Sequence, residues 1–510
     1  MIHRIESIYY RSIDYLWILV WVGLPLTSFP ILGWLTKSQA APFSAIPLGL
    51  LAAIWFFPQV LRGRQLPREM IPILFFALAA IVSSATVYFL DDALYFGSRT
   101  FWGQSLRALL TLAIGLAFYL LTTAWLQTEA SLRRALQWIH IGGAVMLLWG
   151  LMQTVIIITL DGHFPLFLEK IRVWLVIQYY AVREGNRVAS LAYEPSWFAH
   201  QLNLLYLPLW LASTYLRKSV FNIRIFRLSV ENILLAFGLV EFLLSRPRIG
   251  LAALLLAVAF LFIKANVNTV KRISHYLSEH YHLDKRTGKT GGILVALLIS
   301  FAMTALYMAI AFLIVYVGSK FDERLALIFK PIPKAELEII KALNEGTLLY
   351  IGSRLKFLER VIYWLSGWHI FSDYPIFGIG LGNAGFFVQS HVPQTGWMTS
   401  ELRNLVYRLG YAVNTKSYWI RILADTGLVG FSLFVTWLAG LWRSARFLLN
   451  CPNSLYRLIG LAGQLALVAF IFEGFSLDSF ALPYLWIITG LLSAARMTVT
   501  NEKPRGKSLP

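Results

Sequence analysis

The sequence predicts an all-α integral membrane protein, a single polytopic domain over residues 1–510 with about twelve transmembrane helices. A long extracytoplasmic loop containing short amphipathic helices is predicted between the ninth and tenth spans. Hydrophobic residues make up 58% of the chain and charged residues 14%, whereas soluble domains are about 25% charged. The apolar residues come in blocks of about 20, the length that crosses a hydrocarbon core about 30 Å thick. One water-facing globule of this size could not bury so much apolar surface.

Each predicted span is one such apolar block. In chain order the spans cover residues 14–35, 43–61, 70–90, 106–126, 138–160, 197–216, 232–244, 249–264, 291–317, 417–442, 458–475 and 480–495. The seventh and eighth are short, and we expect them to form a tight helical hairpin around residues 245–248. The polar segment over residues 1–14 is interpreted as a retained N-terminus, because no small-residue cleavage site follows a short apolar core.

Lys and Arg residues in the short loops orient the predicted bundle, because cytoplasmic loops carry an excess of them. If the N-terminus is cytoplasmic, the inner loops hold the basic clusters at residues 62–68, 133–134, 217–227, 264–289 and 443–457. The C-terminal tail adds Arg496, Lys503, Arg505 and Lys507, whereas the first short outer loop has Lys37 alone. This alternation predicts a multi-pass protein with both termini in the cytoplasm.

The charge balance and the cysteine count exclude several function classes. A formal net charge of +19 often indicates nucleic acid or an anionic membrane surface as the partner. The membrane explains much of this charge, so no nucleic-acid partner is predicted. The single cysteine, Cys451, permits no intramolecular disulfide, and no Cys/His cluster has zinc spacing. We therefore predict neither a metal nor a cofactor.

Two predicted outer segments, residues 161–196 and 318–416, carry many basic residues on the side where few are expected. Topology does not explain these charges, but an anionic ligand would. The longer segment is predicted to contain an amphipathic helix over residues 333–345, stopped by Gly346. A second helix is predicted over residues 354–371, which have a helical apolar period. Its Trp and Tyr content suits the membrane boundary, and we expect it to lie across the outer mouth of the bundle.

The first candidate cluster lies within residues 186–201, where Arg187 and Glu194 are predicted at the outer surface. Pro195 suits the first turn of a helix. A carboxylate at a helix N-terminus is also favoured by the helix dipole. Glu194 therefore has a structural interpretation beside a functional one.

The second cluster is the pair Arg246 and Arg248, in the very short turn between two apolar spans. Guanidinium groups bind phosphate oxygens in a bidentate manner. Glu241 lies about one turn inside the span and could orient one of these arginines, since an ionisable residue in a span is a functional hypothesis by default. Snorkelling side chains and a structural Glu–Arg pair are the alternatives.

Two further clusters lie later in the chain. Arg354 and Arg360 precede a Pro-x-x-Gly-x-Gly-x-Gly run over residues 375–382, for which we expect a tight turn that passes close to another helix or to the ligand. Residues 414–430 carry Asn414, Arg421 and Asp425 into a span. The last two are four residues apart, a spacing that also indicates a structural ion pair.

Other outer residues have weaker signals. Asp91 and Asp92 form an acidic pair of a kind that can bind a metal, but solvation of a helix end is the simpler interpretation. His163 and His391 are outward histidines that could act as bases near neutral pH, or could simply be solvated.

In this order and on this side of the membrane, the four clusters resemble the O-antigen ligase and polysaccharide polymerase (Wzy-type) superfamily, most strongly over residues 186–430. The motifs that carry the resemblance are Arg187 with Tyr-Glu-Pro-Ser-Trp-Phe-Ala, the Arg248-Ile-Gly turn, Arg360 followed by Asp-Tyr-Pro-Ile-Phe-Gly-Ile-Gly-Leu-Gly-Asn, and Asn414 with Asp-Thr-Gly-Leu-Val-Gly. The resemblance implies a twelve-helix glycosyltransferase of the bacterial inner membrane. Its substrate would be a glycan linked to undecaprenyl diphosphate, and its active site would be extracytoplasmic.

The resemblance also implies roles for individual residues. Outward arginines of the family are thought to hold the donor's diphosphate. This role falls here on Arg187, Arg248 and Arg360, with Arg246, Arg354 and Arg421 as secondary candidates. Ligases typically have a His close to the Asn that begins the late span, and residues 411–413 before Asn414 contain none, which favours a polymerase.

The predicted reaction moves a glycan from a polyprenyl diphosphate to a sugar hydroxyl of a second lipid-linked unit, without a metal. The departing diphosphate is a stable anion, so preorganised arginines can supply the charge stabilisation that it needs. A base still helps the attacking hydroxyl, and Glu194 is the first choice, followed by His391. Membrane lipid, a flippase and a chain-length regulator are the expected partners.

Two alternatives stay open. A ligase would transfer the finished glycan to lipid A core or to protein. A secondary transporter fits the number of spans, although no pair of interrupted helices occupies corresponding halves of the chain.

Overall fold

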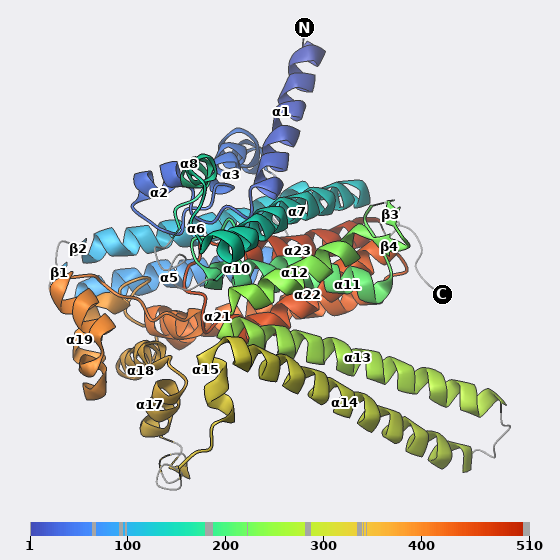
Figure 1. The fold of residues 1–510 in the computed structure, drawn as a ribbon. Coiled ribbons are helices and arrows are strands. Elements are labelled where there is room, and N and C mark those ends of the chain that lie inside the picture. Colours follow the sequence, from blue (N-terminus) through green and yellow to red (C-terminus); the bar gives the residue numbers. More distant parts are fainter. Residues whose placement is uncertain are drawn as a thin grey trace. The chain divides into compact units, whose positions relative to one another are not determined.

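The computed structural model of this chain describes residues 2–63, 68–90, 95–96, 99–178, 187–221, 223–280, 287–333, 339, 341–342 and 344–502. Helices dominate this part of the chain (Figure 1). Its strands form two short antiparallel hairpins, β1 (Tyr95–Phe96) with β2 (Arg99–Thr100) and β3 (Arg224–Ile225) with β4 (Leu228–Ser229). The predicted helical architecture is therefore confirmed. Asp91, Asp92, Lys503, Arg505 and Lys507 lie outside the described residues.

Seven described helical segments are long and apolar enough to cross a membrane. They are Arg68–Thr86, Phe101–Trp125, Glu129–Leu160, Arg248–Val267, Leu297–Lys320, Tyr418–Leu449 and Ser454–Glu473. Each overlaps a predicted span, and the shorter apolar helix Ala45–Leu61 overlaps another. These segments fit an integral membrane protein, whereas the number of twelve spans stays a prediction.

The chain divides into two compact units, Met1–Gly250 with Glu359–Pro510, and Leu251–Leu358. The helices of the first unit are α1 (Ile2–Val22), α2 (Pro30–Thr36), α3 (Ala45–Leu51), η1 (Ala52–Phe56), α4 (Phe57–Leu61), η2 (Arg68–Met70), α5 (Ile71–Leu90), α6 (Phe101–Trp125), α7 (Glu129–Leu160), α8 (Leu166–Leu175), α10 (Pro195–Gln201), η3 (Leu202–Tyr206), α11 (Leu207–Leu216), α12 (Val230–Ser245), the start of α13 (Arg248–His280), nearly all of α18 (Leu358–Asp373), α19 (Ala384–His391), η5 (Gln394–Met398), α20 (Ser400–Leu402), η6 (Arg403–Arg408), α21 (Tyr418–Leu449), α22 (Ser454–Glu473) and α23 (Tyr484–Glu502).

Helix α22 forms much of the core of the first unit. It packs against α21, α11 and α23, and 83% of its apolar stretch is buried. Glycines permit these close approaches: a Cβ on Gly463 would lie 2.4 Å from Leu492 of α23, and a Cβ on Gly460 would lie 2.8 Å from the carbonyl of Ala445 in α21. Small residues at helix contacts are typical of membrane proteins.

The second unit is a long hairpin of α13 and α14 (Thr287–Phe321), followed by α15 (Glu323–Ala326), η4 (Leu327–Phe329) and α17 (Glu345–Arg354). Helices α13 and α14 run side by side (Figure 1), and the Tyr307 hydroxyl donates to the Leu255 carbonyl at 2.5 Å. Further along, the Ser300 hydroxyl donates to the Asn266 side chain at 3.1 Å. These polar contacts lie within the apolar stretches of the two helices, Arg248–Val267 and Leu297–Lys320, and hold them in register.

The first predicted span is wrong over its second half. Helix α1 ends at Val22, and α2 begins at Pro30 after an irregular segment. Pro25 disfavours helical backbone at the residue before it, and the carbonyl of Ser28 accepts from the Ile177 backbone at 2.8 Å instead of continuing a helix. The last predicted span also begins later than expected, at Tyr484.

Both predicted loop helices require correction. Gly346 does not stop a helix, because it lies inside α17, whose N-cap residue Asn344 accepts from the Thr347 backbone at 3.2 Å. Residues 334–338, 340 and 343 of the first predicted helix lie outside the described residues. The helix predicted over residues 354–371 is interrupted, since α17 ends at Arg354 and α18 begins at Leu358. Lys356 between them has a φ of 54°, which hydropathy alone cannot indicate.

Candidate active site

The predicted hairpin turn at residues 245–248 is confirmed, and Arg187 binds it. Helix α12 ends at Ser245, and Arg246 has a φ of 49° before α13 begins at Arg248. Arg187 Nε donates to the Ser245 carbonyl at 2.9 Å, and its Nη2 donates to the Arg246 carbonyl at 3.2 Å. A cation at the negative end of a helix dipole is stabilising. The structure thus brings Arg187 to the same turn as Arg246 and Arg248.

Glu194 lies at the N-cap position of α10, and Pro195 follows it in the first turn, as predicted. Its side chain does not cap the helix backbone. Instead, Glu194 Oε1 accepts a hydrogen bond from the hydroxyl of Ser196. Glu194 is partly exposed as a residue, and a neighbour holds its carboxylate.

A buried polar cluster that the sequence analysis missed lies beside these residues. Glu473, at the end of α22, is fully buried. Its Oε2 lies 2.5 Å from His200 Nδ1, and its Oε1 accepts from Asn203 Nδ2 at 2.5 Å. Asn203 also donates to the carbonyl of Gly250 at 2.8 Å, two residues after Arg248. Three polar side chains inside predicted spans are the signal that could have revealed this cluster.

The segment over residues 476–480, between α22 and α23, is bound by side chains from the two later candidate clusters. Arg360 Nη1 donates to the Ser476 carbonyl at 3.5 Å. Asn414 Nδ2 donates to Asp478 Oδ2 at 3.1 Å, and Arg421 Nη1 donates to the carbonyl of Asp478. Asp478 was not singled out from the sequence, because nothing in its own neighbourhood marks it as a meeting point.

Asp425 joins the glycine run to the late span. The ion pair with Arg421 that the spacing indicates is confirmed, with Arg421 Nε 3.2 Å from Asp425 Oδ2. The same oxygen accepts from the Gly382 backbone at 2.7 Å. The Asp425 carbonyl accepts from Ser83 in α5 at 2.7 Å and from the Gly380 backbone at 2.9 Å. This fully buried aspartate therefore connects α5, the glycine run and α21.

The tight turn expected for the glycine run is confirmed, and it passes close to a helix. Gly378, Gly380 and Gly382 have φ values of 69°, 84° and 83°. A Cβ on Gly378 would lie 2.5 Å from the carbonyl of Ala424. Helix α21 is itself broken here, because Gly427 has a φ of 61° and a ψ of −163°. The freed amides of residues 428 and 429 donate instead to the carbonyls of residues 375 and 376, at 2.8 and 3.2 Å.

Gly427→Ala is expected to destabilise the protein by about 2–4 kcal/mol. The added Cβ would lie 2.3 Å from the Ile376 carbonyl, on a backbone conformation that L residues rarely adopt. Thermal unfolding in detergent would measure this loss. Gly440→Ala, in the same helix with nothing within 4 Å of the new Cβ, is the matched control and should not lower the stability. Equal melting temperatures for the two variants would contradict the proposed backbone constraint.

Helix α18, which carries Arg360, is held by Tyr363. Burial and the nearby Glu401 carboxylate raise the pKa of Tyr363 well above its ordinary value. The hydroxyl therefore stays protonated and donates to Glu401 Oε1 at 3.3 Å.

The other predicted site residues take no part in the contacts described so far. His391 ends α19, with Nε2 3.0 Å from Asp373 Oδ2 and Nδ1 2.7 Å from the Phe387 carbonyl. Arg354 belongs to the second unit, where it donates to the carbonyls of Lys330 and Pro331. Glu241 is 2% exposed and lies against α7, so closely that a Cβ on Gly150 would be 2.0 Å from Oε2. Among the described residues, no three His, Cys, Asp or Glu side chains are grouped to hold a metal ion.

The contacts above form one continuous chain within the first unit. Arg360 binds Ser476, whose backbone N–H donates to the Glu473 carbonyl at 2.9 Å. Glu473 binds Asn203, which binds Gly250 beside the Arg248 turn. Arg187, which precedes this turn in the sequence, binds the Ser245 carbonyl at its start. The structure thus links the segments that carry Arg187, Arg248 and Arg360, although these segments are far apart in the chain.

The comparisons with known proteins agree with the motifs. Residues 227–435 match the family model described as O-antigen ligase (Wzy_C). The matched region includes the Arg246 and Arg248 turn, Arg360, Asn414 and Asp425, whereas Arg187 and Glu194 lie before it. A search of curated proteins finds no match to the chain. Residues 227–435, about two fifths of the chain, are therefore similar to the O-antigen ligase family.

Proposed function

We propose that this chain is a polymerase of lipid-linked oligosaccharide repeat units. It would transfer a growing glycan from undecaprenyl diphosphate to a sugar hydroxyl of another lipid-linked unit, at the outer leaflet of the bacterial inner membrane. The family match supports glycan transfer of the O-antigen ligase or polymerase type. The observation that supports the site is the binding of Arg187 to the backbone of the turn that carries Arg246 and Arg248, because it brings two distant segments with arginines together.

In the proposed reaction, the acceptor hydroxyl oxygen bonds to the anomeric carbon of the donor sugar as the bond from that carbon to the phosphate oxygen breaks. The hydroxyl proton goes to Glu194, and the electron pair of the broken bond stays on the diphosphate. Arg187, Arg248 and Arg360 would stabilise the charge on this leaving group, without need of a metal. The Ser196 hydroxyl orients the Glu194 carboxylate for the proton transfer.

A ligase is the second candidate, and the description of the matching family as O-antigen ligase favours it. The polymerase is preferred because no His lies near Asn414 in the sequence. In addition, His391 is engaged by Asp373 while the Asn414 side chain binds Asp478. A flippase that delivers the lipid-linked units and a regulator of chain length would be the partners of a polymerase.

Lipid analysis of a strain that lacks this gene tests the proposal. A polymerase mutant should accumulate single repeat units on the lipid carrier, because no chain can grow. Long chains that remain unattached on the carrier would instead identify a ligase. Purified protein in proteoliposomes with a lipid-linked repeat unit alone should produce a ladder of longer lipid-linked glycans, and failure to do so under conditions that support binding would contradict polymerisation.

Glu194→Gln is expected to lower transfer by roughly 10²–10⁴-fold, because the amide keeps the size of the side chain but cannot accept a proton. Expression and thermal stability should stay near wild type, since Glu194 makes no side-chain cap to the α10 backbone. The measurement is turnover of the lipid-linked donor alongside a melting curve. Ser196→Ala is the companion variant, with a smaller loss expected. A Glu194→Gln protein that is active, or that fails to fold, would favour the structural interpretation of this carboxylate.

A further inference from the structure

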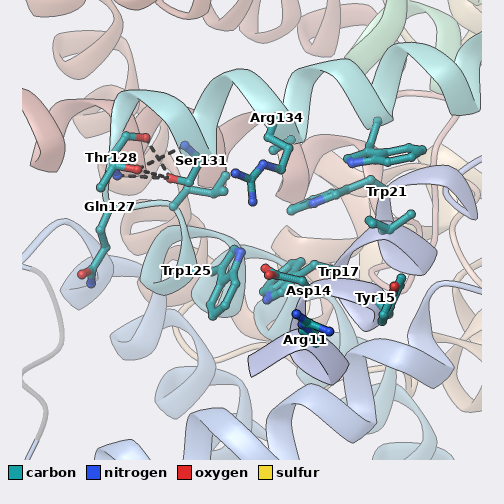
Figure 2. Close-up of a pocket in the computed structure, with 14 residues that line it drawn as sticks. Arg11, Asp14, Tyr15, Trp17, Trp21, Trp125, Gln127, Thr128, Ser131 and Arg134 are labelled. Carbon is teal, nitrogen blue, oxygen red and sulfur yellow. Dashed lines mark hydrogen bonds between the residues drawn. The ribbon is translucent and has the colours of Figure 1, made fainter. Parts of the chain in front are cut away.

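A candidate second site lies between α1 and the junction of α6 with α7, and none of the residues that line it is assigned to glycan transfer. A cavity of about 470 Å³ opens there, a volume within the usual range for small-ligand sites. Figure 2 shows its lining, with Arg11, Asp14, Trp17 and Trp21 from α1 facing Arg134 and Ser131 from α7. The proposed reaction uses none of these side chains.

One wall of the cavity is a stack of indole rings. Trp17 stacks on Trp21 with ring centroids 4.8 Å apart and on Trp125 with centroids 5.9 Å apart. Trp17 is 2% exposed, yet its Nε1 has no hydrogen-bond acceptor among the described residues. A buried N–H without an acceptor costs free energy.

The charged side chains of the cavity are not paired with one another. Among the described residues, neither Arg11 nor Arg134 forms an ion pair or a side-chain hydrogen bond, and Asp14 forms none either. The hydroxyls of Thr128 and Ser131 satisfy each other in the capping box of α7 (Figure 2). The charged groups that a ligand meets in this cavity are therefore the guanidinium groups of Arg11 and Arg134, with the Asp14 carboxylate beside them.

This combination matches a phospholipid at the membrane surface. Trp residues favour the boundary between water and hydrocarbon. The Lys and Arg distribution predicts that the start of α7 is cytoplasmic, the side whose leaflet carries anionic lipids. A free phosphate ion would use the arginines but would leave the indole wall without an apolar partner.

We propose that this cavity binds the head group of an anionic phospholipid. Arg11 and Arg134 would bind the phosphate oxygens, and the Trp rings would cover the glycerol and the first methylenes of the acyl chains.

Native mass spectrometry of the purified full chain tests this, with dioleoyl-phosphatidylglycerol and dioleoyl-phosphatidylcholine as matched probes. Wild type should retain the anionic lipid preferentially. Arg134→Ala should weaken its binding about fivefold, and the double variant Arg11→Ala/Arg134→Ala about 25-fold, since each surface cation contributes about a factor of five. The arginines are exposed, so neither variant should lower the melting temperature measured without added lipid.

Arg133→Ala is the matched control, because Arg133 is the sequence neighbour, pairs with Glu129 at 3.3 Å and does not line the cavity. It should bind the anionic lipid like wild type. Equal retention of the two lipids by wild type would overturn the proposal, as would equal losses in Arg133→Ala and Arg134→Ala. Displacement of the lipid by millimolar inorganic phosphate would identify a simple anion site instead, and would overturn it too.

Discussion

Arg248→Ala should abolish growth of the lipid-linked glycan while expression stays near the wild-type level. Arg248 begins α13 directly after the turn that Arg187 binds, so its guanidinium is proposed to hold the departing diphosphate. Removal of one preorganised donor to a developing charge typically lowers turnover by roughly 10²–10³-fold. Turnover of a lipid-linked repeat unit by purified protein would measure the loss.

Two companion variants sharpen this test. Arg248→Lys keeps the charge but loses the planar fork that binds two phosphate oxygens, so an intermediate turnover is expected. Arg224→Ala removes an exposed arginine on β3 and should leave turnover unchanged. Wild-type turnover in Arg248→Ala would show that this arginine does not bind the diphosphate. Loss of the folded protein in the alanine variant, with Arg248→Lys also unfolded, would assign it a structural role instead.

Asp425→Ala should destabilise the protein by about 3–5 kcal/mol, the usual cost of removing one partner of a buried ion pair. Arg421 is 8% exposed and would keep a charge without its carboxylate. The Gly382 backbone N–H would also lose its acceptor. The expected result is a large drop in the melting temperature in detergent, or no folded protein at all.

Glu129→Ala is the control for this loss of a carboxylate. Its ion pair with Arg133 is 3.3 Å long, but both side chains are 40% exposed, so the change in stability should be below about 1 kcal/mol. A second comparison is Asp425→Asn, which keeps an acceptor oxygen for Gly382 and should be less destabilised than the alanine variant. Unchanged stability in Asp425→Ala would contradict the central position of this aspartate.

Part of the site could be predicted from local sequence. The four-residue spacing of Arg421 and Asp425 indicated their ion pair, because residues that far apart share one face of a helix. The glycines at 378, 380 and 382 indicated a tight turn against another element, because they alone accept positive φ without strain. The short turn at Ser245–Arg248 followed from two adjacent apolar blocks. In contrast, the end of α1 and the break at Lys356 were misplaced, because neither hydropathy nor an apolar period shows where a helix is interrupted.

By itself, the sequence predicted a membrane environment, the position of most of the long helices and the order of the motifs. These features depend on hydropathy and residue spacing within one helix turn or one span, so local sequence is enough to predict them. Only the tertiary structure decided that Arg187 binds carbonyls 58 and 59 residues away. The same holds for the contacts of Glu473 with His200 and Asn203, which lie 273 and 270 residues away in the sequence. Such contacts depend on which helix faces pack together, and no local pattern encodes that choice.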